Sequence, residues 1–201
     1  MKKIFLFLLG AALGLPAAQA FAQADTMRVR GTITAVAADT LSLKSREGQD
    51  LKLALNDKTG YAYPKAIKLA DIKAGDFVGA TAVPDAEGRM IAREVRLFPE
   101  AARGTGEGHR PWDLEAGSTM TNASVSTKVQ ASSGEELTLD YKGGSRKILV
   151  PPGVPVVTNL PGDRSLLAVG KYVVAIVAVG ADSKGTVLRI QVEKDGVRPP
   201  A

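Results

Sequence analysis

The chain is poor in the residue types that most often carry chemistry. It contains no cysteine, one histidine and one tryptophan among 201 residues, and aromatic residues make up 5%. The lack of cysteine excludes disulfides, thiol catalysis and thiolate-bound metals. The few aromatic residues also argue against a nucleic-acid surface, which combines a clustered basic stripe with stacking aromatic side chains.

Long apolar runs are also missing, except at the N-terminus. Two lysines precede the apolar run 4–15, and alanine then occupies every second position over 18–24. This order predicts a secretory signal peptide over residues 1–24, cleaved near Ala22 or Ala24. About a dozen apolar residues are too few for a bilayer span, which needs about 20. We therefore expect a periplasmic or secreted protein with no membrane span in the mature chain.

Charge of one sign is not concentrated anywhere. The formal net charge is +5, of which two lysines leave with the predicted signal peptide, so the mature chain carries about +3. Basic residues such as Arg28, Arg30 and Arg96 occur singly on the polar side of alternating runs. This spacing is typical of a solvated sheet face, so we expect no nucleic-acid partner.

What is present is a repeated pattern. Gly75–Val78 recurs as Gly170–Val173, and Val95–Leu97 recurs as Ile190–Val192, with an offset of 95 residues in both cases. Each copy carries several short apolar-alternating runs, which predict strands. The predicted strands of the first copy are 28–36, 41–43, 51–55, 77–83 and 90–98. A further extended segment is expected at 61–64, and one helical turn over 69–75. Those of the second copy are 123–129, 137–139, 146–150, 154–158, 172–179 and 187–192.

These elements predict an all-β protein with two tandem, small, five-stranded, OB-like barrels after the signal peptide. Closure into a barrel removes the exposed edges of so short a sheet. The expected organisation is a first barrel at 25–98, a glycine-rich linker at 99–122, a second barrel at 123–196 and a tail at 197–201.

Four stretches of the first copy carry a resemblance to a known family: Gly31–Ile33, Leu41–Leu43, Leu69–Val78 and Ala92–Val95. Together they resemble an exported bacterial β-barrel family that is classed as a domain of unknown function. The likeness covers residues 28–98 and is weaker in the second copy. It implies a fold and a compartment, and it implies no reaction.

The linker holds the only His and the only Trp, among three glycines at alternate positions. Such a loop is a favoured place for recognition. The candidate ligand- or partner-binding residues are Arg103, Glu107, His109, Arg110, Trp112 and Asp113.

The same segment admits other interpretations. It can be a structural staple in which Trp112 and Leu114 dock between the barrels and the charged residues pair around them. Carboxylates beside an imidazole suit divalent ions, so Glu107, His109 and Asp113, with Glu115, are weak metal candidates. His109 and Asp113 with Ser118 or Thr119 would sketch a hydrolase, although no nucleophile elbow frames either hydroxyl.

The sequence therefore predicts a non-enzymatic exported module without a cofactor, which binds an unidentified envelope protein or polymer or has a structural role there through its central loop. The alternative is a periplasmic carrier of a small ligand or divalent metal, and an envelope hydrolase is the third choice. The oligomeric state stays open.

Overall fold

The computed structural model describes residues 26–180 and 185–200. Regular structure in these residues consists of strands and three short 3-10 turns, at Leu69–Asp71, Glu100–Ala102 and Arg164–Leu166. No helix in this part of the chain is long and apolar enough to cross a membrane. The predicted all-β class is thus confirmed, while the predicted signal peptide lies outside the described residues.

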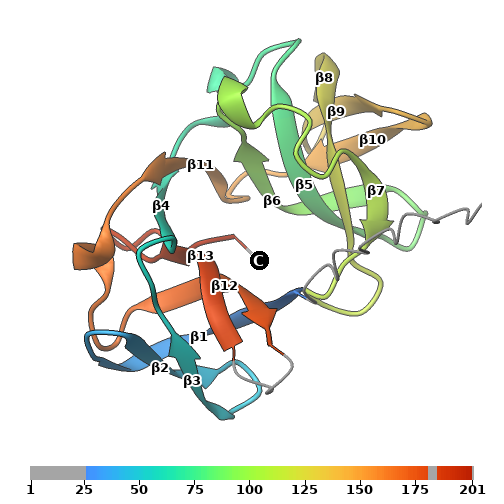
Figure 1. Cartoon of the computed structure of the whole chain (residues 1–201). Helices are drawn as coiled ribbons and strands as arrows, with labels where there is room; N and C mark the ends of the chain where they lie inside the picture. Colours follow the sequence, from blue (N-terminus) through green and yellow to red (C-terminus); the bar gives the residue numbers. More distant parts are fainter. Residues whose placement is uncertain (1–25, 181–184, 201) are drawn as a thin grey trace, which may run out of the picture.

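The first of two closed five-stranded barrels, here called barrel A, lies in the lower half of Figure 1. Its antiparallel neighbours run in the order β3, β2, β1, β12, β13, and a parallel pairing of β13 with β3 closes the ring. Alternating side chains such as Ile33, Leu43 and Ile190 point inward and are fully buried. Its strands are β1 (Thr26–Val36), β2 (Thr40–Ser45), β3 (Asp50–Ala54), β12 (Tyr172–Val179) and β13 (Gly185–Val192).

Barrel B has the same construction. Its antiparallel neighbours run in the order β10, β9, β8, β5, β6, and a parallel pairing of β10 with β6 closes it. Val78, Val95 and Leu139 are among its fully buried core residues. Its strands are β5 (Phe77–Pro84), β6 (Met90–Leu97), β8 (Thr119–Ala131), β9 (Gly134–Tyr141) and β10 (Gly144–Val150), and β7 (Gly108–Pro111) pairs antiparallel with the first four residues of β8.

Two further strands, β4 (Gly60–Ala66) and β11 (Val156–Pro161), connect the barrels (Figure 1). β4 runs parallel to β13 of barrel A, β11 runs parallel to β6 of barrel B, and the two pair antiparallel with each other. At the centre of their ladder Pro64 faces Asn159, which lies 95 residues further along the chain. The β5–β6 and β12–β13 pairings also match at this offset, so the two barrels are related by an approximate two-fold axis.

The barrels are not the contiguous domains expected at 25–98 and 123–196. Each takes three strands from one half of the chain and its closing hairpin from the other: β12–β13 complete barrel A and β5–β6 complete barrel B. The alternation of apolar residues specifies which side chains face a core, but not which core. The two hairpins have matching internal registers, and the extended strands β4 and β11 carry the chain from one ring to the other.

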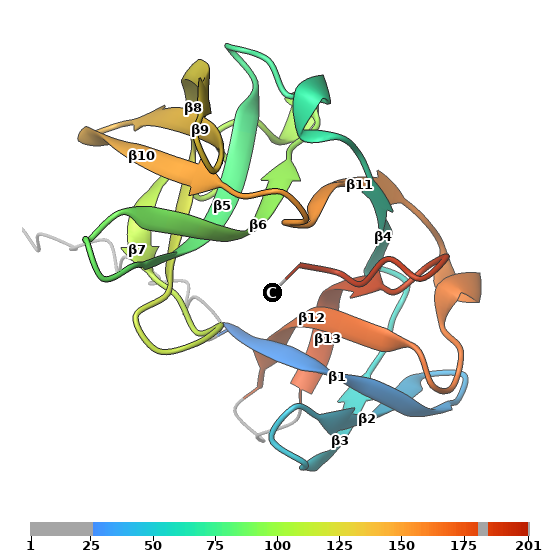
Figure 2. The ribbon, with the colours of Figure 1, turned by 180° about the vertical axis from the view of Figure 1, so that it is seen from behind.

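The end of the described chain lies between the two barrels, as both Figure 1 and the reverse view in Figure 2 show. A tight turn at 194–197, with φ of 51° at Asp195 and 77° at Gly196, reverses the chain after β13. Pro199 and Pro200 are buried as a result. The tail is therefore part of the packed structure between the barrels.

Candidate functional site

A cleft of about 190 Å³ lies between the barrels, with the central segment, residues 103–114, along one side. Outward-facing side chains of β1, β12 and β13 form its barrel A wall, and those of β5, β6 and β8 form its barrel B wall. Three pairs of lining residues on the two hairpins are equivalent at the 95-residue offset: Gly79 with Val174, Glu94 with Arg189, and Arg96 with Gln191. The cleft therefore lies near the approximate two-fold axis, where its two walls carry different chemistry.

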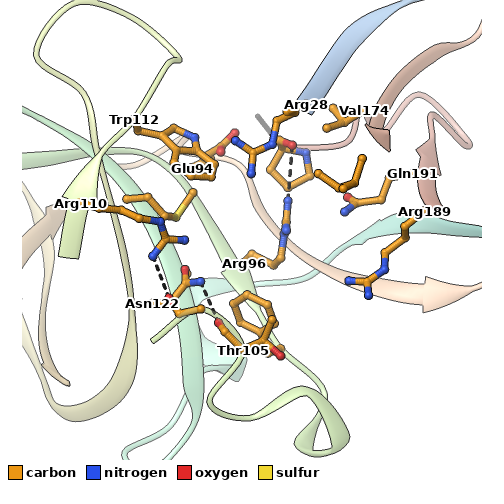
Figure 3. Close-up of a pocket in the computed structure, with 16 residues that line it drawn as sticks. Arg28, Glu94, Arg96, Thr105, Arg110, Trp112, Asn122, Val174, Arg189 and Gln191 are labelled. Atoms are coloured by element: carbon orange, nitrogen blue, oxygen red, sulfur yellow. Dashed lines mark hydrogen bonds between the residues drawn. The ribbon is translucent and has the colours of Figure 1, made fainter. Parts of the chain in front are cut away.

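Figure 3 shows arginines converging on this cleft from four strands. Arg28 comes from β1, Arg189 from β13, Arg96 from β6 and Arg110 from β7. The acidic residue of the lining is Glu94, whose Oε1 accepts a hydrogen bond from Thr81 at 2.9 Å. Positive charge thus exceeds negative charge in the cleft lining.

Arg96 is the most enclosed of these cations. Its Nε is buried and has no hydrogen-bond partner in the described structure, and its Nη2 donates to the Pro200 carbonyl over 3.4 Å. Burial lowers the pKa of the Arg96 guanidinium, because removal from water disfavours the charged form. The side chain keeps hydrogen-bonding capacity that the chain uses only weakly.

Trp112 is half-buried and forms part of the cleft wall beside two arginines. The guanidinium carbon of Arg28 lies 3.9 Å from the ring centroid and that of Arg110 lies 5.3 Å from it. Both distances suit cation–π attraction. Burial, followed by repulsion from Arg30, lowers the pKa of Arg28. A change in the charge state or position of Arg28 would therefore change the surroundings of the indole.

Asp113 attaches the central segment to barrel A. Its two carboxylate oxygens each accept a hydrogen bond of 2.8 Å from Arg30 of β1, and Arg28 Nη1 lies 3.6 Å away. These arginines lower the pKa of Asp113 to about 2, with the Arg30 hydrogen bond as the main cause. Arg46 also donates to the Asp113 carbonyl at 3.2 Å. A hydrogen bond of 2.8 Å from Ser118 Oγ to the Trp112 carbonyl closes the loop formed by residues 112–118.

The other predicted site residues lie apart from Asp113. Arg103 pairs with Glu100 at 2.6 Å, and Glu107 accepts from the Lys142 backbone at 2.8 Å. Arg110 donates to the Gly106 carbonyl at 2.7 Å and also lines the cleft. The ion pairing expected among these residues is therefore not formed, because Asp113 pairs with Arg30 and not with Arg103 or Arg110.

His109 lies on barrel B. Its Nδ1 is 2.8 Å from Thr121 Oγ1, and its ring is stacked on Tyr141 with centroids 6.3 Å apart. Burial, followed by repulsion from Arg146, lowers the pKa of His109. The Thr121 hydroxyl is completely buried, so no substrate could reach it, and Ser118 bonds to Trp112 and Glu115 instead. The His109–Asp113 arrangement of a hydrolase is therefore not formed.

No three His, Asp or Glu side chains gather into a group that could hold a metal ion within residues 26–180 and 185–200. Glu107, His109 and Asp113 have the separate partners given above. The weak metal candidates are thus not brought together by the fold.

Several cleft residues were missed by sequence reasoning, chiefly Arg28, Glu94, Arg96, Asn122, Arg189 and Gln191. The expectation that Arg28, Arg30 and Arg96 cover a solvated face was wrong, because the outer faces of the two barrels turn toward each other. The Arg30 side chain is only 4% exposed. The outward positions were recognisable from the alternation, but the strand partners that enclose them were not.

A glycine on the floor of the cleft makes this packing possible. A Cβ on Gly79 would lie 2.7 Å from Asn122 Oδ1 and 3.0 Å from the Phe98 ring. The first distance is shorter than real Cβ contacts and the second is tighter than most, so any side chain here would force Asn122 and Phe98 to shift from their positions against β5. Asn122 in turn donates to the Thr105 carbonyl at 3.0 Å, which holds the central segment over barrel B.

Comparisons with models of known families, with curated proteins and with solved structures found no match to this chain.

Proposed function

We propose that the chain is an exported, non-enzymatic binding protein that holds a small ligand in the cleft between barrels A and B. The observation that carries this proposal is the convergence of four arginines, Trp112 and the two amide side chains of Asn122 and Gln191 on one cavity of about 190 Å³. Ligand sites often form where two structural units meet, with a few polar groups set in a partly apolar lining.

In this proposal the central segment has both a structural role and a binding role. Its Asp113 end fixes the segment to barrel A, and the Asn122–Thr105 hydrogen bond fixes it to barrel B. Between these points, Arg110 and Trp112 face the cleft. The staple therefore supports a wall of the proposed site, with Trp112 as a built-in reporter of binding.

Isothermal titration calorimetry on the purified chain tests this function with four probes of different charge: inorganic phosphate, succinate, glycerol and putrescine. We expect at least one to bind. Ile176→Trp, which places a large side chain in the cleft, should abolish binding. Leu188→Trp, at a position 46% exposed and outside the cleft lining, should leave binding unchanged. Absence of binding by all four probes, or equal loss in both variants, would refute the proposal.

We also propose that the chain is related to the exported barrel family, and that it arose from two copies of one unit. The matching registers of β5–β6 and β12–β13 at an offset of 95 residues support the origin from two copies. Export itself rests on the N-terminal sequence pattern.

A further inference from the structure

We infer that the ligand of the cleft is a compact oxyanion, a carboxylate or phosphate group on a small molecule, held by Arg96 with help from Arg28, Arg110 and Arg189. This inference rests on the proposed function, because it names the chemical class of the ligand that the cleft takes.

The first argument is the balance of charge. Glu94 is the acidic residue in the lining, and it already accepts a hydrogen bond from Thr81. Asp113 stands close by, but Arg30 occupies both of its oxygens and Arg28 lies 3.6 Å from one of them. Four guanidinium groups around one cavity repel one another and a cationic ligand, and they attract an anion.

The second argument compares two enclosed arginines. Arg30 meets a carboxylate through two parallel hydrogen bonds of 2.8 Å. Arg96 has one long hydrogen bond, to the neutral carbonyl of Pro200, and a distant contact with the Phe98 ring at 6.0 Å, and the attraction of the Glu94 carboxylate offsets only part of the effect of burial on its pKa. A buried charge is stabilised when it is paired, and a guanidinium pairs best with two oxygens of one anion. Arg96 is therefore the group that gains most from an incoming oxyanion.

The third argument is size. A volume of about 190 Å³ lies below the range of about 300–1,000 Å³ for drug-sized ligands. Inorganic phosphate or a short carboxylic acid fits such a space, whereas a nucleotide would not be enclosed. Met120, Val174 and Ile176 add apolar lining, which suits the short hydrocarbon part of a carboxylic acid.

Calorimetric titration of the full chain at low ionic strength tests this inference, with inorganic phosphate, succinate, glycerol and putrescine as probes. We expect a dissociation constant of about 1 mM or tighter for at least one anion and no heat from the other two. Arg96→Gln should weaken anion binding at least about tenfold. Glutamine is a conservative choice because Gln191 occupies the equivalent position on β13. Arg189→Gln, at an exposed edge, should weaken binding about threefold.

Arg146→Gln is the matched control, because it removes one exposed arginine of barrel B outside the cleft lining and should change binding by less than about twofold. Tighter binding of succinate assigns a carboxylate, and tighter binding of phosphate assigns a phosphate group. Equal effects of Arg96→Gln and Arg146→Gln would overturn the inference. If the circular dichroism spectrum shows that Arg96→Gln does not fold, the effect of Arg189→Gln on anion binding tests the inference instead. Binding of glycerol or putrescine instead of the anions would overturn this inference but would still support the proposed function. Absence of binding heat from all four probes would refute both.

Discussion

Replacing Asp113 by asparagine should destabilise the folded chain by about 2 kcal/mol, because it removes the carboxylate that neutralises Arg30. Arg30 donates two hydrogen bonds of 2.8 Å to this carboxylate, and its own side chain is only 4% exposed. Asparagine has nearly the same shape but no charge, and it can accept only one of these bonds. The change therefore tests the ion pair with little effect on packing.

The magnitude follows from two contributions. The pKa of Asp113 falls from 3.8 to about 2, which sets an upper limit of about 2.4 kcal/mol for the charge interaction. Because the Asp113 side chain is 57% exposed, solvent screening reduces this contribution to about 1 kcal/mol. Leaving Arg30 enclosed without its partner costs about 1 kcal/mol more.

The same pair predicts a pH dependence. The folded state holds Asp113 ionised more strongly than the unfolded state does, so the pair stabilises the fold fully above about pH 4. This contribution is lost as the pH falls toward about 2, where the folded carboxylate also takes up a proton. The asparagine variant lacks this group, so its free energy of unfolding should vary less with pH in that window.

Urea denaturation followed by circular dichroism measures these quantities for the native chain and the variant between pH 7 and pH 2. Glu87→Gln is the control, since Glu87 is exposed and has a single contact of 3.4 Å with Arg89. The Glu87→Gln control should lower the free energy of unfolding by less than about 0.5 kcal/mol. If Asp113→Asn costs no more than Glu87→Gln, the central segment is not fixed to barrel A by this pair, and the reasoning is refuted.

Two further changes probe the cleft floor and the histidine. Gly79→Ala should lower the free energy of unfolding by about 1–3 kcal/mol, because the new Cβ displaces Asn122 and Phe98. Gly60→Ala is the control and should lower it clearly less, because its Cβ would have its nearest neighbour at 3.7 Å. Comparable melting temperatures of the two variants would contradict the tight packing at Gly79. His109→Gln should flatten the loss of stability on acidification below about pH 6.5, because the folded state lowers the pKa of His109 and the unfolded state binds its proton first. Denaturation at pH 7, 6 and 5 measures this difference, and identical slopes for the variant and the native chain would argue against it.

Much of the local structure could be predicted from the sequence. Strict alternation around Val29 and Ile33 or around Leu51 and Leu53 predicts strands, and these strands are present. The short turn after residue 69 was also expected, and it forms as a 3-10 turn followed by Gly75 at a φ of 91°. The strand β7, at 108–111, was missed, because four residues within a glycine-rich loop carry no alternating pattern.

The candidate site was predicted only in part, and for a physical reason. The central segment stood out because it holds the only His and Trp, and Trp112 and Arg110 do line the cleft. Arg96 and Arg189 did not stand out, since an outward-facing arginine on a strand looks the same whether water or a second barrel faces it. Their grouping depends on residues from distant strands that no local pattern connects.

The sequence by itself determined the all-β class, the strand-sized alternation, the repeat offset of 95 residues and the position of the unusual central segment, because these depend on local periodicity and composition. Only the tertiary structure decided which hairpin closes which barrel, and that choice turned two outer faces toward each other. Pairing between equivalent hairpins is a competition among similar apolar faces, which alternation leaves undecided. The cleft, its four arginines and the role of Asp113 all follow from that decision.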